Sequence, residues 1–170
     1  MTNGILAAAL FVLGFPSGGT AQSKDALVGT WKLVSVTDTT DKGEVRDAYG
    51  RNPTGFLTYT ADGRMMAIIT KGGRKPLSVR DRVSASAEER AEAFSSVVAY
   101  AGRYTFAGDR VIHHVEADVM PNLVSTDQVR FVVKLERSRV ILRTPPFLKD
   151  GVQITTELVW ERMKPDATDR

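Results

Sequence analysis

Hydrophobic and polar residues alternate along most of the chain from residue 27 onward. Alternation of this kind is typical of β-strands that have one buried and one solvated face. It predicts strands over residues 27–37, 55–60, 64–70, 103–106, 110–117, 128–135, 140–144 and 152–161. Short turns with glycine, such as Ala61-Asp62-Gly63 and Ala107-Gly108-Asp109, separate several of these segments. Because short links join antiparallel neighbours, we expect one antiparallel sheet.

One segment has a helical pattern instead. Ser86 is a candidate N-cap and Glu89 follows three residues later, which is the spacing of a capping box. Apolar residues then recur on one helical face, at Ala91, Phe94, Val97, Val98 and Ala101. The sequence therefore predicts an amphipathic helix that begins after Ser86, ends at Gly102, and packs on the wall of the sheet or plugs one end of it.

The number and order of the strands predict an all-β fold. Eight consecutive antiparallel strands remove their exposed edges when they close into a barrel. With 170 residues, of which 42% are hydrophobic, the chain is long enough for one domain with a sizeable core. We therefore expect a closed or nearly closed antiparallel β-barrel of about eight strands with one amphipathic helix, and a flat sandwich is the alternative.

Alternate positions along the strands separate an apolar face from a charged face. The apolar face carries Trp31, Leu33, Ser35, Tyr104, Phe106, Val111, His113, Val115, Val129, Phe131, Val133, Leu135, Val140, Leu142, Thr144, Ile154, Thr156, Leu158 and Trp160. The other face carries Lys32, Arg103, Arg110, His114, Glu116, Gln128, Arg130, Lys134, Arg143, Glu157 and Glu161. Because the burial of an unpaired charge is costly, we expect the charged face to point outward.

The interior predicted in this way is apolar with a few polar groups, which is typical of a pocket for a small molecule. The candidate ligand-binding residues are His113, Tyr104, Tyr59, Phe131, Thr156 and Ser35. His113 is also a candidate general acid or base, with Tyr104 assisting. The structural alternative is a core histidine whose hydrogen bonds are satisfied by Tyr104 or Thr156, with the aromatic residues as ordinary core packing.

A β-bulge within a strand would change which side chains point inward. A bulge in the strand at residues 110–117 would turn His114 and Glu116 toward the interior, and a change of parity would also bring in Arg130. Without such a change, His114 and Glu116 form a solvated pair on the outer face. Gln128 and Arg130 then form an outer hydrogen-bond network beside that pair.

The first 21 residues have the pattern of an export signal. Residues 5–15 form an apolar run that is too short to span a bilayer comfortably, and Gly19 and Ala21 suit the small-residue positions of a cleavage site. We expect residues 1–21 to be a signal peptide and residues 22–170 to be the barrel domain, exported to the periplasm or secreted, without a membrane span in the mature form. The alternatives are a misassigned start codon and an N-terminal anchor that stays attached.

Composition and charge argue against several classes of function. The net charge is +3 with mostly interleaved signs, and the basic cluster from Lys71 to Lys75 lacks aromatic residues, so we expect no nucleic-acid binding. The chain has no cysteine and only two histidines, adjacent and on opposite strand faces, so we expect no metal site. Nucleotide-binding and nucleophile motifs are missing from the sequence, and we expect no cofactor.

Motifs at both ends of the predicted barrel carry a family resemblance. Gly29-Thr30-Trp31 opens the first strand as a Gly-x-Trp motif, and Arg162 follows Trp160 in the last strand. The other matching segments are Lys32-Leu33-Val34-Ser35, Thr54-Gly55-Phe56-Leu57-Thr58-Tyr59-Thr60 with Asp62-Gly63, Ala99-Tyr100-Ala101-Gly102-Arg103-Tyr104, His113-His114-Val115-Glu116, Pro121-Asn122, Gln128-Val129-Arg130 and Leu158-Val159-Trp160-Glu161-Arg162.

On these segments the chain resembles the bacterial and fungal lipocalin-like domain proteins, from about Leu27 to Met163. The resemblance implies a calycin-type barrel in which the motif tryptophan, Trp31, closes the base. It also implies that a basic residue late in the chain packs across this tryptophan, and Arg162 is the first candidate with Lys164 as the second. The resemblance implies a pocket and offers no catalytic motif.

Three functions are compatible with these features. The first is the binding of a small, mostly apolar or amphipathic molecule, with His113, Tyr104 and Tyr59 orienting its polar end. The second is a cofactor-independent cyclase, isomerase or dehydratase that uses His113 as its general acid or base. The third is an interaction module that docks a partner on its outer charged face or on the basic loop with Lys71, Arg74 and Lys75.

Overall fold

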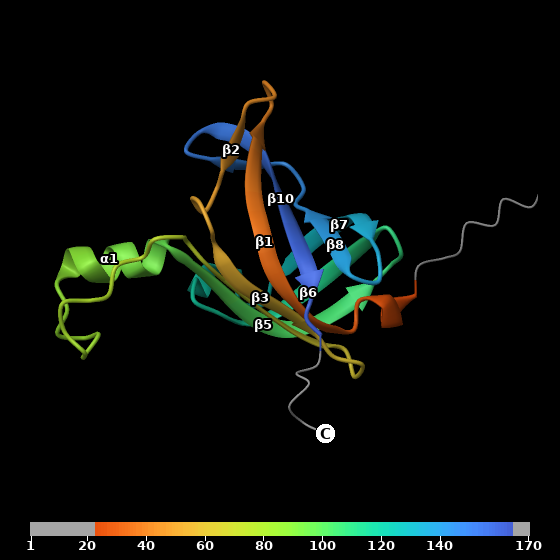
Figure 1. Cartoon of the computed structure of the whole chain (residues 1–170), viewed down its shortest axis with the longest axis horizontal. Coiled ribbons are helices and arrows are strands. Elements are labelled where there is room, and N and C mark those ends of the chain that lie inside the picture. Colours follow the sequence, from red (N-terminus) through yellow and green to blue (C-terminus); the bar gives the residue numbers. More distant parts are fainter. Residues whose placement is uncertain (1–22, 165–170) are drawn as a thin grey trace, which may run out of the picture.

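The computed structural model describes residues 23–164, and within them ten strands form one antiparallel sheet. Eight of the strands close into a barrel, because β1 (Gly29–Thr40) pairs with β10 (Val152–Arg162) (Figure 1). The barrel strands between them are β3 (Thr54–Tyr59), β4 (Arg64–Thr70), β5 (Val97–Phe106), β6 (Arg110–Asp118), β7 (Asp127–Leu135) and β8 (Arg139–Arg143). The short strands β2 (Val45–Asp47) and β9 (Phe147–Lys149) pair with β1 and β10. The predicted closed barrel of about eight strands is confirmed.

Packed side chains close the end of the barrel where β1 begins. Trp31 is fully buried there, and its indole Nε1 donates to the Leu27 carbonyl oxygen at 2.9 Å. The Arg162 guanidinium stacks over the indole, with 4.0 Å between its Cζ and the ring centroid, and donates to the Val28 carbonyl oxygen at 2.5 Å. Gly29 has a φ of +134°, and a Cβ on it would lie 2.6 Å from Arg162 Nη1. The position expected for Arg162 across the motif tryptophan is therefore confirmed.

The helix is shorter than the sequence predicts. α1 spans Ala87–Ser95, and the capping box between Ser86 and Glu89 is present at its start. Residues 97–101, which the apolar spacing assigns to the helix, instead belong to β5 and pair with residues 66–70 of β4. The physical reason is that the edge of β4 offers these residues a complete ladder of backbone hydrogen bonds, which overrides their helical spacing.

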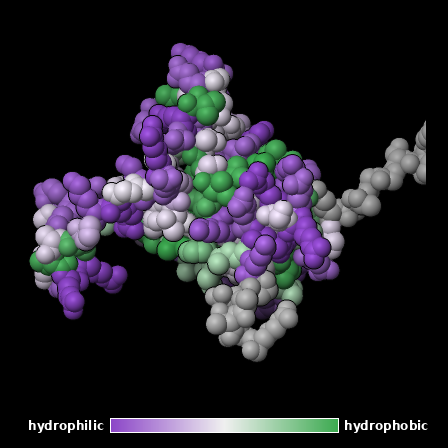
Figure 2. Space-filling model, in the orientation of Figure 1, coloured by the Kyte–Doolittle hydropathy of each residue, from purple (hydrophilic) through white to green (hydrophobic). Residues whose placement is uncertain are grey.

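The helix also lies elsewhere than expected. α1 projects away from the barrel (Figure 1), and no residue in it is buried. Figure 2 shows hydrophilic residues over most of this projecting segment, whereas hydrophobic residues gather on the body of the barrel. The prediction that the helix packs on the wall or plugs one end is therefore wrong.

Bulges decide which side chains face the interior. One extra residue lies between Leu33 and Ser35 in β1, one opposite Ala101 and Gly102 in β6, and one between Val132 and Lys134 in β7. Each bulge reverses the alternation along the rest of its strand. Beyond them, Val36 and Asp38 of β1 and Asp118 of β6 face inward.

Where no bulge intervenes, the predicted inward faces are confirmed. The buried residues in these stretches are Trp31, Leu33, Tyr104, Val111, His113, Val115, Val140, Leu142, Ile154, Thr156, Leu158 and Trp160. None of residues 23–164 lies in a helix that is long and apolar enough to cross a membrane.

Candidate functional site

The barrel contains a cavity of about 480 Å³. It lies toward the strand ends farthest from the Trp31 base, because its lining includes the end of β1 and the beginnings of β5 and β7. The apolar part of the lining consists of Val36, Leu57, Ala67, Ile69, Val98, Leu142, Leu158 and Trp160, with Val119, Met120, Leu123 and Phe147 toward the rim. Met120 and Phe147 are solvent-exposed, so the cavity opens at this end.

His113 lines the cavity and lies between two tyrosine hydroxyls. Its ring is buried, with Nε2 2.7 Å from the Tyr59 hydroxyl and Nδ1 2.9 Å from the Tyr100 hydroxyl. Burial, followed by the charge of Arg130, lowers the pKa of His113 well below its usual 6.5, so the ring is neutral at pH 7. Burial likewise raises the pKa of Tyr59 and of Tyr100, so both hydroxyls keep their protons.

Counting hydrogens assigns a direction to these two bonds. A neutral imidazole has one N–H donor and one nitrogen acceptor. Within residues 23–164, the Tyr59 hydroxyl contacts no hydrogen-bonding group except His113 Nε2, so it must donate to Nε2 or leave its hydrogen buried and unpaired, which is costly. Nδ1–H therefore donates to the Tyr100 oxygen, and the Tyr100 hydroxyl hydrogen is free to point into the cavity.

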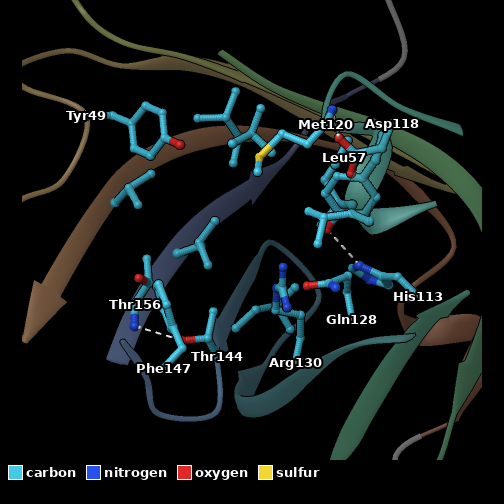
Figure 3. Close-up of a pocket in the computed structure, with 18 of the residues that line it drawn as sticks. Tyr49, Leu57, His113, Asp118, Met120, Gln128, Arg130, Thr144, Phe147 and Thr156 are labelled. Atoms are coloured by element: carbon cyan, nitrogen blue, oxygen red, sulfur yellow. Dashed lines mark hydrogen bonds between the residues drawn. The ribbon is translucent and has the colours of Figure 1, made fainter. Parts of the chain in front are cut away.

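Arg130 and Gln128 of β7 also line the cavity, beside His113 (Figure 3). The prediction that they belong to an outer hydrogen-bond network is therefore wrong, as is the inward orientation predicted for Val129, Phe131 and Val133. Phe131 is 37% exposed and lies on the outer surface under Arg110, with 5.8 Å between the guanidinium Cζ and the ring centroid. The reason is the bulge between Val132 and Lys134, which reverses the alternation along β7. Leu135 points inward beyond the bulge, and the even-numbered residues point inward before it.

A second polar cluster lies toward the rim of the cavity. Asp38 is only 1% exposed, and its carboxylate accepts hydrogen bonds from the Thr156 hydroxyl at 2.7 Å and from Lys149 Nζ at 3.0 Å. Arg46 approaches the same carboxylate, with 3.8 Å between Nε and Oδ2. Burial and the charge of Asp38 raise the pKa of the neighbouring Tyr49 hydroxyl. The Asp38 charge is therefore compensated within the protein, and this cluster joins β1, β9 and β10.

The other predicted pocket residues lie in two places. Tyr104 packs against Tyr59, with 4.7 Å between ring centroids, and its hydroxyl donates to the Thr60 carbonyl oxygen at 3.0 Å. Both tyrosines therefore stand behind His113 in the core, outside the cavity lining. Ser35 also lies outside the lining, because the bulge after Leu33 turns it away from the interior. Of the predicted ligand-binding residues, His113 and Thr156 line the cavity.

His114 and Glu116 remain on the outer surface of the barrel. The bulge in β6 does exist, but it lies beyond His114 and turns Asp118 inward instead. His114 Nδ1 is 2.7 Å from Asp127 Oδ1. The Glu116 carboxylate accepts from Arg64 at 2.5 Å and from Arg103 at 2.9 Å. The two residues thus have separate partners and do not pair with each other.

Six polar lining residues among residues 23–164 are not predicted from the sequence, namely Asp38, Tyr49, Tyr100, Asp118, Gln128 and Lys149. Tyr100 was assigned to the helix, although its alternation with Val98 also fits a strand. Asp38 and Asp118 follow bulges, and a carboxylate alone gives no sign that it faces inward. Among residues 23–164, no three His, Asp or Glu side chains group in a way that could hold a metal ion.

The sequence that forms the barrel and its closed base matches a known protein family. The sequence model of the family described as a lipocalin-like domain matches residues 28–163. The chain belongs to the lipocalin-like domain family. The match spans the barrel from the segment before β1 to the residue after β10. No curated protein matches this lipocalin-like chain.

Three solved structures that match this lipocalin-like domain share little sequence with it. A lipocalin-like protein from Bacteroides uniformis is 13% identical, with 81% of this chain and 99% of that chain covered and a TM-score of 0.42. An uncharacterized protein from Bacteroides eggerthii has the same identity, 13%, the same coverage, 81% and 99%, and the same TM-score, 0.42. A redesigned β-barrel is 14% identical, with 82% and 94% covered and a TM-score of 0.38.

Proposed function

We propose that this protein binds a small, mostly apolar molecule inside its barrel. The observation that carries the proposal is the cavity of about 480 Å³, whose walls are apolar apart from a few hydrogen-bonding groups. Pockets of several hundred Å³ with this composition are typical of small-molecule sites. The polar end of the ligand would lie at Tyr100 and His113, because the hydroxyls of Tyr59 and Tyr104 already form hydrogen bonds inside the core.

Catalysis by His113 has less support. Both ring nitrogens are hydrogen-bonded to tyrosine hydroxyls, so a ligand reaches neither of them directly. A cyclase, isomerase or dehydratase on this site would have to pass its proton through the Tyr100 hydroxyl. Turnover that persists in His113→Gln would remove His113 from such a mechanism.

We also propose that the protein is exported. The support is the signal-like pattern of residues 1–21, which lie outside the described residues. The intact mass of protein recovered from the periplasm of a Gram-negative host should equal that of residues 22–170. A mass that still includes residues 1–21 would contradict cleavage.

Native mass spectrometry of the protein purified from its own host tests the binding proposal. We expect a reproducible small-molecule adduct that denaturation releases. Ala67→Phe should abolish the adduct, because Ala67 lines the cavity and a phenyl ring there fills it. Ala117→Phe is the matched control, because Ala117 is exposed on β6 outside the cavity and the adduct should persist.

Two results would contradict the binding proposal. One is a native mass spectrum that shows only the ligand-free protein, together with the finding that the protein binds no added apolar probe, neutral or charged. The other is an adduct that persists in a folded Ala67→Phe variant, because the molecule would then lie elsewhere. Thermal unfolding of both variants shows whether they are folded.

A further inference from the structure

We propose that the ligand carries an anionic group, with a carboxylate as the best fit, and that Arg130 and the Tyr100 hydroxyl bind it inside the cavity. This inference rests on the proposed binding function and specifies the chemistry of the ligand. It predicts an amphipathic monocarboxylate whose apolar part fills the rest of the cavity. The geometry that supports it is the convergence of a cation and hydrogen-bond donors on one side of an apolar chamber (Figure 3).

Arg130 has a positive charge without a partner. Among residues 23–164, no Asp or Glu oxygen lies within ion-pair distance of its guanidinium. Within that range its Nη1 donates to the Val129 carbonyl oxygen at 2.8 Å, and the guanidinium also lies within hydrogen-bonding reach of the Tyr100 hydroxyl. A guanidinium has five N–H donors, so most of them remain for a ligand. A cation in an apolar chamber is costly unless an anion compensates it.

The Tyr100 hydroxyl supplies a second donor. Its oxygen accepts from His113 Nδ1–H, as the hydrogen count requires, so its own hydrogen points toward the cavity. The Arg130 guanidinium lies close enough to this hydroxyl to oppose the rise that burial causes in the pKa of Tyr100. Two donors at one place fit the two oxygens of a carboxylate, and the planar guanidinium suits that group in particular.

The remaining charges around the cavity fall into two groups. Asp38 and Lys149 compensate each other toward the rim. Asp118 is the charge that opposes an anion, because it also lines the cavity and its charge raises the pKa of Tyr100. One Asp118 oxygen accepts from the Met120 backbone N–H at 2.7 Å, and the other has no hydrogen-bond partner within residues 23–164. Removal of this charge in Asp118→Asn should therefore strengthen the binding of an anion.

Displacement of a neutral fluorescent dye, 1-aminoanthracene, separates the proposed function from the proposed ligand chemistry. Dodecanoate and dodecan-1-ol serve as competitors at about pH 8, where the fatty acid is ionised and both have the same chain. We expect dye binding, with displacement by both competitors and a clear preference for dodecanoate. Arg130→Met should lower the affinity for dodecanoate by about 30-fold or more. The affinity for dodecan-1-ol should stay within about twofold of the wild-type value.

Matched controls are present in the chain. Arg110→Met removes an exposed guanidinium from the neighbouring strand β6 and should leave both affinities unchanged. Tyr100→Phe should weaken the binding of dodecanoate. Tyr104→Phe removes a hydroxyl that donates to the Thr60 carbonyl oxygen outside the cavity lining, and should not change the preference. Thermal unfolding verifies that each variant is folded.

The outcomes separate two failures. If the dye binds and both competitors displace it equally well, or if a folded Arg130→Met keeps the preference for dodecanoate, then the barrel binds ligands and the anion site is wrong. If neither the dye nor either competitor binds the wild-type protein, the binding function and the anion site fail together. A preference that Arg110→Met also removes would indicate general surface charge and would overturn the assignment to Arg130.

Discussion

At the scale of single residues, the cavity is distinguished by where its polar atoms find partners. His113 is held on both sides by tyrosine hydroxyls, and Asp38 is held by Thr156 and Lys149. Arg130 and the Tyr100 hydroxyl hydrogen keep unused capacity directed at the cavity.

The neutral state of His113 predicts a pH dependence of stability. The pKa of His113 in the folded protein is well below the usual 6.5, so the unfolded chain takes up a proton there first. Stability should therefore be fully present above about pH 6.5 and fall as the pH drops below it, by up to about 1.4 kcal/mol per pH unit. Urea unfolding between about pH 5.5 and 7.5 measures this slope.

The chain offers a matched control, because its other histidine is the adjacent and partly exposed His114. His113→Gln should flatten the stability profile in this range, and His114→Gln should not. Proton NMR of the two imidazole rings provides an independent readout. A His113 ring that titrates near pH 6.5 in the folded protein would refute the neutral buried state.

At the scale of secondary-structure elements, bulges and strand pairing outweigh local sequence preference. The bulges in β1 and β6 place Asp38 and Asp118 on the inner face, and the bulge in β7 separates the stretch with Arg130 from Leu135. Residues 97–101 belong to β5 although their spacing is helical, and their place in this strand brings the Tyr100 hydroxyl to His113. The polar part of the cavity thus depends on irregular elements.

The projecting helix predicts a small effect for a large substitution. Phe94 is 52% exposed on α1, so Phe94→Ala should change the free energy of unfolding by no more than about 0.5 kcal/mol. Phe106→Ala is the control in β5, because Phe106 packs against the core and its loss should cost more than about 2 kcal/mol. A loss at Phe94 as large as that at Phe106 would show that the helix docks on the barrel. Chemical denaturation measures both values.

At the scale of the whole molecule, the barrel is closed at one end and open at the other. Trp31 and Arg162 join the first and last strands at the base, and the opposite end opens onto the cavity. The cavity walls are nevertheless part of the core, because Leu57, Leu142 and Trp160 belong to the core cluster and also line the cavity.

Closure by Arg162 predicts a measurable loss of stability. Arg162→Met removes the stacking on Trp31 and the hydrogen bonds to carbonyl groups before β1, and should cost about 1–3 kcal/mol. Arg139→Met is the control on β8, because its pair with Glu161 is exposed and should contribute less than about 1 kcal/mol. Equal losses in the two variants, measured by urea unfolding, would contradict a special role for Arg162.

Alternation in the sequence by itself determined the barrel and the inward position of His113, and the closed base was expected from the family resemblance. Alternation is a local property, and the burial of apolar residues enforces it wherever a strand is regular. Only the tertiary structure decided that Arg130, Tyr100, Asp38 and Asp118 line the cavity and that Phe131 and Ser35 do not. The physical reason is that bulges and strand ends are set by pairing with neighbouring strands, so a single residue inserted in one strand reverses the faces beyond it.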